Sequence, residues 1–201
     1  MKRLRSGFTV VELMIVLGVM MVLAALLYPR FQSVIKERRA LQTLELMRHI
    51  AEGVAKLYDD CGVLPADDEL TVLWSLNGST EPSITNPAEV LGECWQGPYF
   101  TPPKHNDSGH VVGIPIATSE IYFHISNEDL NNNGIGTELT LQVDNIPADI
   151  ALVIERKVDG PAKGLNKTGK WTCPDAEGAT SATEYVTCYY ILYESGSSSG
   201  S

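Results

Sequence analysis

The chain has 201 residues, of which 15 are Lys or Arg and 25 are Asp or Glu, so its formal net charge is −10. Its apolar content of 44% excludes a disordered chain, and its mixed composition excludes a collagen-like protein. The acidic balance argues against nucleic acid as a partner, because neutralising phosphates requires clustered Lys and Arg side chains.

The first predicted element is a membrane-spanning helix over residues 8–28. Glu12 is the only charged residue in this stretch, which is long enough for roughly 30 Å of helix and therefore for one hydrocarbon core. Lys2, Arg3 and Arg5 precede it, so the positive-inside rule places the N-terminus in the cytoplasm and the following residues outside. A cleaved signal peptide is the alternative, but it would have a shorter apolar stretch and a small-residue cleavage site at its border.

Glu12 is the most informative residue of this segment. An ionised carboxylate at the centre of a membrane span costs about 2.5–3.5 kcal/mol, so such residues usually have a function. A plain membrane anchor leaves this carboxylate unexplained. The residues around it are Ser6-Gly7-Phe8-Thr9-Val10-Val11-Glu12-Leu13-Met14-Ile15-Val16. This run resembles the processing site of the type IV pilin and type II secretion pseudopilin superfamily.

The resemblance implies processing and assembly. In that family a prepilin peptidase cuts after the glycine and methylates the new amino terminus, which correspond to Gly7 and Phe8 here. Glu12 stands at the position of the family's glutamate, fifth after the cut, and Pro29 stands at that of a frequent helix proline. In a staggered filament, Glu12 of one subunit can meet the Phe8 amine of a neighbour, because two paired buried charges are tolerable whereas either alone is costly.

The helix is predicted to continue to about residue 60, where Cys61-Gly62 ends it. Apolar residues at three-to-four spacing predict one buried face along its second half, and His49 on that face is interpreted as a core residue rather than a ligand. The residues of this face are Phe31, Val34, Ile35, Arg38, Leu41, Leu44, Met47, His49, Ile50, Val54, Leu57 and Tyr58.

The rest of the chain predicts a small body. Turn signals dominate residues 61–110, with a short helix expected near Asp67. Strands are predicted over residues 120–125, 139–143 and 185–193, with a short helix after Asp144-Asn145 that includes Ile146. The predicted fold class is α+β, a long N-terminal transmembrane-plus-amphipathic helix packed on a small antiparallel sheet, as in pilins. The predicted organisation is a leader (1–7), a transmembrane and assembly helix (8–28), its amphipathic continuation (29–60), a globular head (61–194) and a flexible Gly/Ser tail (195–201).

Four cysteines in an exported body indicate disulfides. Three pairings are possible, and we favour Cys61–Cys94 and Cys173–Cys188 because each joins neighbours in sequence. The second pair resembles the disulfide-bounded loop near the C-terminus of many type IV pilins. A zinc site is the alternative, but no Cys-x-x-Cys is present and the spacing does not support it.

A calcium loop is predicted between the first two strands. Alternating oxygen-bearing residues followed by Gly134 match the first half of such a loop, but Thr140 stands where a bidentate Glu is needed. Glu138 or Asp144 could substitute, and pseudopilins often bind calcium in such a region. An Asn/Gly hairpin turn is the alternative. The tentative ligands are Asp129, Asn131, Asn133, Ile135 and Glu138.

Two classes of function follow from these features. The first is a structural subunit of a type IV pilus or a type II secretion pseudopilus, held in the inner membrane with a cytoplasmic N-terminus and a periplasmic head before assembly. Its partners would be copies of itself and other pilin-like subunits, prepilin peptidase, the inner-membrane assembly platform and membrane lipid. The second class is a membrane-tethered periplasmic binding module or enzyme, which has no use for Glu12.

Other motifs discriminate less. We find no Gly-x-Ser-x-Gly, His-Glu-x-x-His or phosphate loop, so no enzyme activity and no required cofactor are predicted. The run Trp95-Gln96-Gly97-Pro98-Tyr99 resembles a stretch of the major secretion pseudopilins, although a Trp beside a tight turn explains it as well. That run and the calcium-like loop favour a subunit of a type II secretion pseudopilus, whereas the C-terminal cysteine loop favours a subunit of a type IV pilus.

Overall fold

A computed structural model describes residues 9–67, 69–75, 91–113, 120–128, 130, 138–160, 169–174, 176, 179 and 183–193. The chain divides into two compact units, Met1–Arg38 and Arg39–Ser201.

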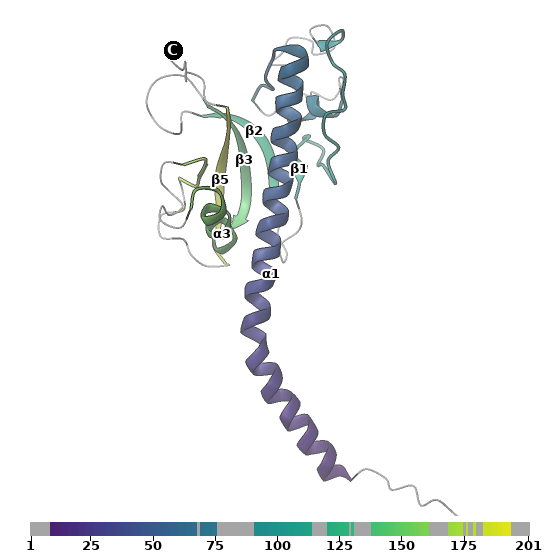
Figure 1. The fold of residues 1–201 in the computed structure, drawn as a ribbon, viewed down its shortest axis with the longest axis vertical. Helices are drawn as coiled ribbons and strands as arrows, with labels where there is room; N and C mark the ends of the chain where they lie inside the picture. Colours follow the sequence, from purple (N-terminus) through teal and green to yellow (C-terminus); the bar gives the residue numbers. More distant parts are fainter. Residues whose placement is uncertain are drawn as a thin grey trace, which may run out of the picture. The chain divides into compact units, whose positions relative to one another are not determined.

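One long helix, α1 (Val10–Cys61), contains both the apolar stretch and the amphipathic stretch (Figure 1). Pro29 lies inside the helix without ending it. Gly62 follows with φ of 68°, the left-handed conformation in which glycine caps helices, and its N–H donates to the Tyr58 carbonyl at 2.8 Å. The predicted helix and its C-terminal end are therefore confirmed.

Within the second unit, α1 buries one face. The spacing of three and four residues between its buried apolar side chains gives a single stripe. Leu41, His49 and Tyr58 do not belong to this stripe, which corrects the prediction from the sequence: Leu41 and Tyr58 are each 44% exposed, and the His49 side chain is 54% exposed. The His49 Nε2 lies 3.4 Å from Glu45 Oε1. The remaining residues predicted for the buried face lie before this unit and are exposed as well: Phe31, Val34, Ile35 and Arg38. Residue 49 lies about 100° around the helix from Ile50, so it turns away when Ile50 points into the core. The buried apolar residues are Ala40, Leu44, Met47, Ile50, Val54 and Leu57.

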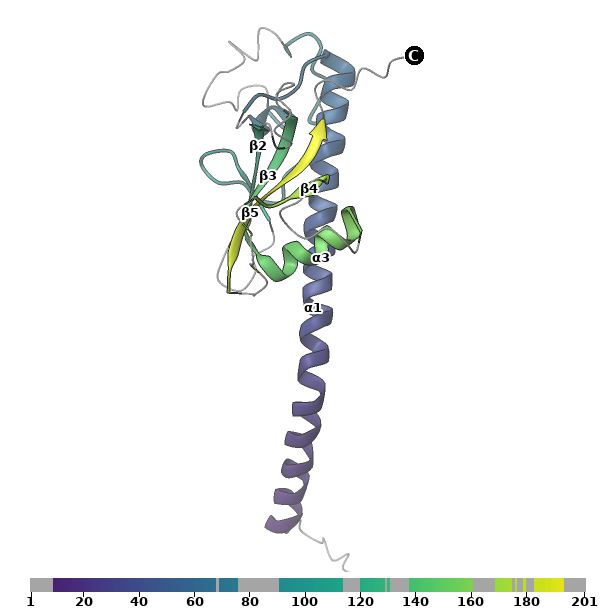
Figure 2. The ribbon, with the colours of Figure 1, turned by 90° about the vertical axis from the view of Figure 1, so that its left-hand side faces the viewer.

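The strands of the second unit form an antiparallel sheet of five strands in the order β1-β2-β3-β5-β4. Figure 2 labels β2, β3, β4 and β5 of this sheet. Three strands were predicted from the sequence and two, β1 and β4, were not, because two residues show no alternation. The strands are β1 (Val111–Val112), β2 (Tyr122–Glu128), β3 (Glu138–Pro147), β4 (Trp171–Thr172) and β5 (Tyr185–Tyr193).

Alternate residues of the central strands face the core. Phe123, Ile125, Leu141 and Val143 are at most 1% exposed and join the buried stripe of α1 in one hydrophobic core. A helix packed on an antiparallel sheet gives the predicted α+β class.

The helix predicted after Asp144-Asn145 begins later than expected. β3 continues through these residues and through Ile146, and α3 (Ala148–Val158) follows. Asn145 has φ of 61° and lies where the pairing with β5 shifts register, and its Nδ2 donates to the Glu120 carbonyl at 2.9 Å. Because Asn tolerates the left-handed region, the strand bulges there instead of ending. The short helix expected near Asp67 is the 3₁₀ turn η1 (Leu70–Leu73).

The run from Trp95 to Tyr99 is held by local packing. Trp95 Nε1 donates to the Val72 carbonyl at 3.0 Å, and the Trp95 and Tyr99 rings meet edge to face with centroids 5.8 Å apart. The Tyr99 hydroxyl accepts the Gln96 N–H at 2.8 Å. Partial burial raises the pKa of the Tyr99 phenol, and the nearby Asp60 carboxylate adds to the rise, so the hydroxyl stays neutral at physiological pH.

Gly97 is required by this packing, because a Cβ there would lie 2.5 Å from the Trp95 ring. Gly97→Ala is therefore expected to lower the free energy of unfolding by about 1–3 kcal/mol, the usual cost of overpacking. Gln96→Ala is the matched control, since Gln96 is exposed and donates through its backbone, and its effect should stay within about 0.5 kcal/mol. Thermal unfolding of the two variants checks this, and equal melting temperatures would refute the packing role.

Candidate functional site

Glu12 forms a capping box with Thr9 at the start of α1. The Thr9 N–H and the Thr9 hydroxyl both donate to Glu12 Oε2 at 2.9 Å, and the Glu12 N–H donates to Thr9 Oγ1 at 3.3 Å. Reciprocal bonds of this kind satisfy backbone groups that a helix N-terminus leaves without partners. Thr9 is a functional residue that the sequence analysis missed, although Thr-x-x-Glu before an apolar run is the sequence signature of a capping box.

The capping box fixes the direction of the Glu12 carboxylate. It holds the group at the N-terminus of the helix, where the helix dipole favours negative charge. Among the described residues, the hydrogen bonds to this carboxylate all reach Oε2. The geometry therefore leaves room for a second donor at Oε1. Gly7 and Phe8, the predicted cleavage and methylation site, lie outside the described residues.

The apolar side chains that the structure describes in the first unit are uncovered. Every residue from 9 to 35 is exposed, with Val10 at 77% and Met21 at 72%. This part of α1 is long and apolar enough to cross a membrane. Burying one large apolar side chain is worth about 1.5–3 kcal/mol, so a run of them in water is strongly unfavourable. The segment needs lipid or other polypeptide around it.

Both favoured disulfides are present in the structure. Cys61, at the end of α1, is bonded to Cys94 with an S–S distance of 2.06 Å, and Cys173 is bonded to Cys188 of β5 at 2.01 Å. Cys173 and Cys188 are fully buried. All four cysteines are thus used structurally, and the second bridge ties the segment after β4 to β5 within the core.

The calcium prediction is not tested by the structure. Asp129, Asn131, Asn133 and Ile135 lie outside the described residues. Glu138 is buried, and its Oε2 accepts the Leu130 N–H at 2.9 Å. Within the part of the chain that the structure describes, no group of three His, Cys, Asp or Glu side chains is placed to hold a metal ion. Calcium binding stays a prediction.

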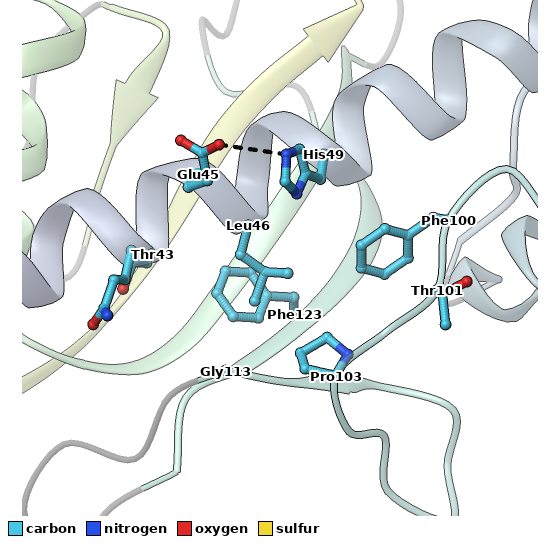
Figure 3. Close-up of a pocket in the computed structure, with 10 residues that line it drawn as sticks. Thr43, Glu45, Leu46, His49, Phe100, Thr101, Pro103, Gly113 and Phe123 are labelled. Carbon is cyan, nitrogen blue, oxygen red and sulfur yellow. Dashed lines mark ion pairs between the residues drawn. The ribbon is translucent and has the colours of Figure 1, made fainter.

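A pocket of about 360 Å³ lies beside α1 in the second unit (Figure 3). Leu46, Phe100 and Phe123 give it apolar walls, and the Glu45–His49 pair lies at its rim on the exposed surface of the helix. The residues that line it do not combine a nucleophile, a base within hydrogen-bond reach and a third group that orients the base. The pocket therefore gives no candidate reaction.

Comparison with known proteins points to the N-terminal segment. Residues 2–28 match the prokaryotic N-terminal methylation motif. The chain is 34% identical over 85 residues to fimbrial protein EcpC of Eikenella corrodens, a match that covers 42% of this chain and 56% of that protein. The chain thus matches little more than half the length of this curated relative. No solved structure matches the chain significantly. Together with the long apolar helix and the five-stranded antiparallel sheet, these matches make the chain similar to the type IV pilin-like superfamily.

Proposed function

We propose that the chain is a structural subunit of a type IV pilus or a type II secretion pseudopilus. The observation that carries the proposal is the exposed apolar stretch of α1. Near its N-terminus lies Glu12, whose carboxylate forms the capping box with Thr9 and falls within the methylation motif. The comparisons point to a structural subunit rather than an enzyme. The fimbrial relative favours the pilus of these two filaments.

The membrane holds the subunit before assembly. Residues 8–28 span the inner membrane with the basic leader, residues 1–7, in the cytoplasm and the head, residues 61–194, in the periplasm. Residues 29–60 continue the helix into the head. Assembly then replaces lipid around the apolar stretch with helices of other copies and of other pilin-like subunits. Prepilin peptidase and an inner-membrane assembly platform are the partners that this route requires.

Cleavage after Gly7 prepares the pairing between subunits. It removes the three leader cations and creates an amino group on Phe8, four residues before Glu12. The capping box keeps the Glu12 carboxylate at the same end of the helix, with Oε2 on Thr9. The Phe8 amine of a neighbouring subunit can then bind the second oxygen. Such a pair sets the register between staggered helices, since either charge would be costly alone in an apolar environment.

Mass spectrometry of the protein from its native host tests the proposed processing. We expect a mature chain that begins at N-methylated Phe8. Gly7→Leu should accumulate as full-length precursor, because the peptidase needs the glycine before the cut, whereas Ser6→Ala should be processed as the wild type is. A mature chain that begins beyond Tyr28 would instead identify an ordinary secreted protein and would overturn the proposed function.

A further inference from the structure

Two histidines face each other across the first two strands of the sheet, far in sequence from the N-terminal segment that carries the proposed function. Val111 pairs with Phe123 in the antiparallel register of β1 and β2, so His110 lies opposite His124 when that register is continued by one residue. His110 Nε2 and His124 Nδ1 are 3.5 Å apart. The two rings are nearly perpendicular, with an interplanar angle of 87° and centroids 4.7 Å apart.

The next strand orients the second ring. His124 Nε2 is buried and lies 3.4 Å from Asp144 Oδ2, an ion-pair contact that does not have hydrogen-bond geometry. The other oxygen of this carboxylate, Oδ1, accepts from Thr187 Oγ1 at 2.8 Å and from Gln142 Nε2 at 3.0 Å, so the group is fixed between β3 and β5. A carboxylate beside Nε2 favours the tautomer that carries its proton there, and this leaves the Nδ1 lone pair directed at His110.

A tight turn fixes the backbone of the first histidine. Asn106 Oδ1 accepts the N–H groups of Ser108 at 3.1 Å and of His110 at 2.9 Å, and Gly109 supplies the left-handed φ of 82° that the turn needs. The turn therefore fixes the backbone of His110, and the two rings meet each other through the contact between Nε2 and Nδ1. Lys104 and Glu120, which precede β1 and β2, bond to each other at 2.6 Å, and this bond lowers the pKa of Glu120.

We propose that His110 Nε2 and His124 Nδ1 are the two protein ligands of a divalent transition metal of the zinc type. Two imidazole nitrogens that bind tetrahedral zinc at about 2.0–2.1 Å lie about 3.3 Å apart, close to the separation seen here. Asp144 acts as a positioning residue behind His124, as carboxylates commonly do behind metal-bound histidines. Water or another donor completes the coordination. Imidazole ligands suit zinc, nickel and copper and do not suit calcium, so this site is chemically distinct from the tentative calcium loop.

Zinc binding to the full chain in detergent, purified without a polyhistidine tag, tests the proposal. In competition with a zinc-sensitive chelator dye and in excess calcium, we expect one Zn²⁺ per chain. His110→Ala and His124→Ala should each weaken zinc binding at least about tenfold, because each variant leaves the metal with only one of its two imidazole ligands. His105→Ala is the matched control, since His105 is an exposed neighbour outside the pair, and its affinity should equal that of the wild type. Zinc at ten times its Kd should raise the melting temperature by about 3–6 °C in the wild type and not in the two ligand variants.

Two further measurements separate a metal site from a polar contact between two rings. X-ray absorption of the zinc-loaded chain should show two imidazole nitrogens on the metal. Asp144→Asn should lower the zinc affinity by about 10–100-fold while the same two nitrogens remain bound. His110→Gln and His124→Gln replace the alanine variants if either of those fails to fold. A wild type that binds no zinc, or a loss in His105→Ala as large as that in His110→Ala, would overturn the proposal and leave the rings as a neutral contact.

Discussion

Glu12→Ala is expected to reduce entry into filaments by more than a hundredfold while membrane insertion and cleavage after Gly7 persist. Removing a charge from the span makes insertion as good or better, and the cut site is untouched. In the filament, however, the Phe8 amine of each incoming subunit would face apolar neighbours without a partner. Breaking a buried ion pair costs about 3–5 kcal/mol, and each 1.4 kcal/mol corresponds to a factor of ten.

Glu12→Gln separates the two roles of this side chain. Glutamine can stand at the third position of a capping box, so the contacts with Thr9 survive, but it cannot neutralise an amine. If charge pairing controls assembly, Glu12→Gln should fail as Glu12→Ala does. Thr9→Ala removes the cap and keeps the charge, so it should cost about 1 kcal/mol and reduce assembly only about fivefold.

Shearing cells and comparing filament-borne protein with the membrane pool measures all three variants at equal expression. Wild-type incorporation of Glu12→Gln together with failure of Glu12→Ala would mean that the cap matters and the charge does not. Wild-type incorporation of both would overturn the pairing between Glu12 and the Phe8 amine. Absence of the wild-type protein itself from the sheared filaments would overturn the filament proposal and favour the membrane-tethered alternative. Processing by mass spectrometry serves as the control in each case, because an uncleaved variant cannot report on pairing.

Removal of the Cys61–Cys94 disulfide should destabilise the folded chain by about 4 kcal/mol, and removal of Cys173–Cys188 by about 3 kcal/mol. These values follow from the chain-entropy relation for sequence separations of 33 and 15 residues. Alanine is the replacement of choice at Cys173 and Cys188, since both are fully buried and serine would bury a hydroxyl. Removing Cys173 and Cys188 also leaves a cavity in the core, which adds to the destabilisation. The difference between the two disulfides in free energy of unfolding is therefore smaller than the chain-entropy values alone suggest.

Thermal unfolding of the two double-alanine variants without reductant checks these values. A loss of about 4 kcal/mol corresponds to a fall of about 8–16 °C in melting temperature for a chain of this size. Non-reducing peptide mapping of the wild type provides the control, because it should recover the same two linked peptides. A variant whose melting temperature equals that of the wild type would contradict the stabilising role of the disulfide that it lacks.

The sequence predicts those elements whose pattern extends over several residues. The apolar stretch of α1, the glycine after it and the β-branched strands β2, β3 and β5 were all recognisable from periodicity. β1 and β4 were not, because at two residues their formation depends on the strands beside them rather than on their own sequence. His49 was misplaced because one residue of error in a helix rotates a side chain by about 100°.

The site shows the same limit. The composition of the span singled out Glu12, but the bonds to Thr9 became visible only when the first turn of α1 was in place. From the sequence, Asn145 is predicted to precede a helix, because a local polar pair resembles a helix cap. The pairing with β5 shows instead that β3 continues and forms a bulge at this residue. The sequence gives no sign that His110 and His124 meet, because the register that brings them together is a property of the sheet.

The order of the strands has a consequence for subunits that accumulate at high local density in a membrane. Both outer strands of the described sheet, β1 and β4, are only two residues long. Long, flat outer strands offer unpaired backbone groups to any identical chain nearby and so promote aggregation, whereas very short ones offer little to pair with. Stored subunits would thus resist sticking to one another sheet by sheet, and contact between copies would be left to the apolar helix.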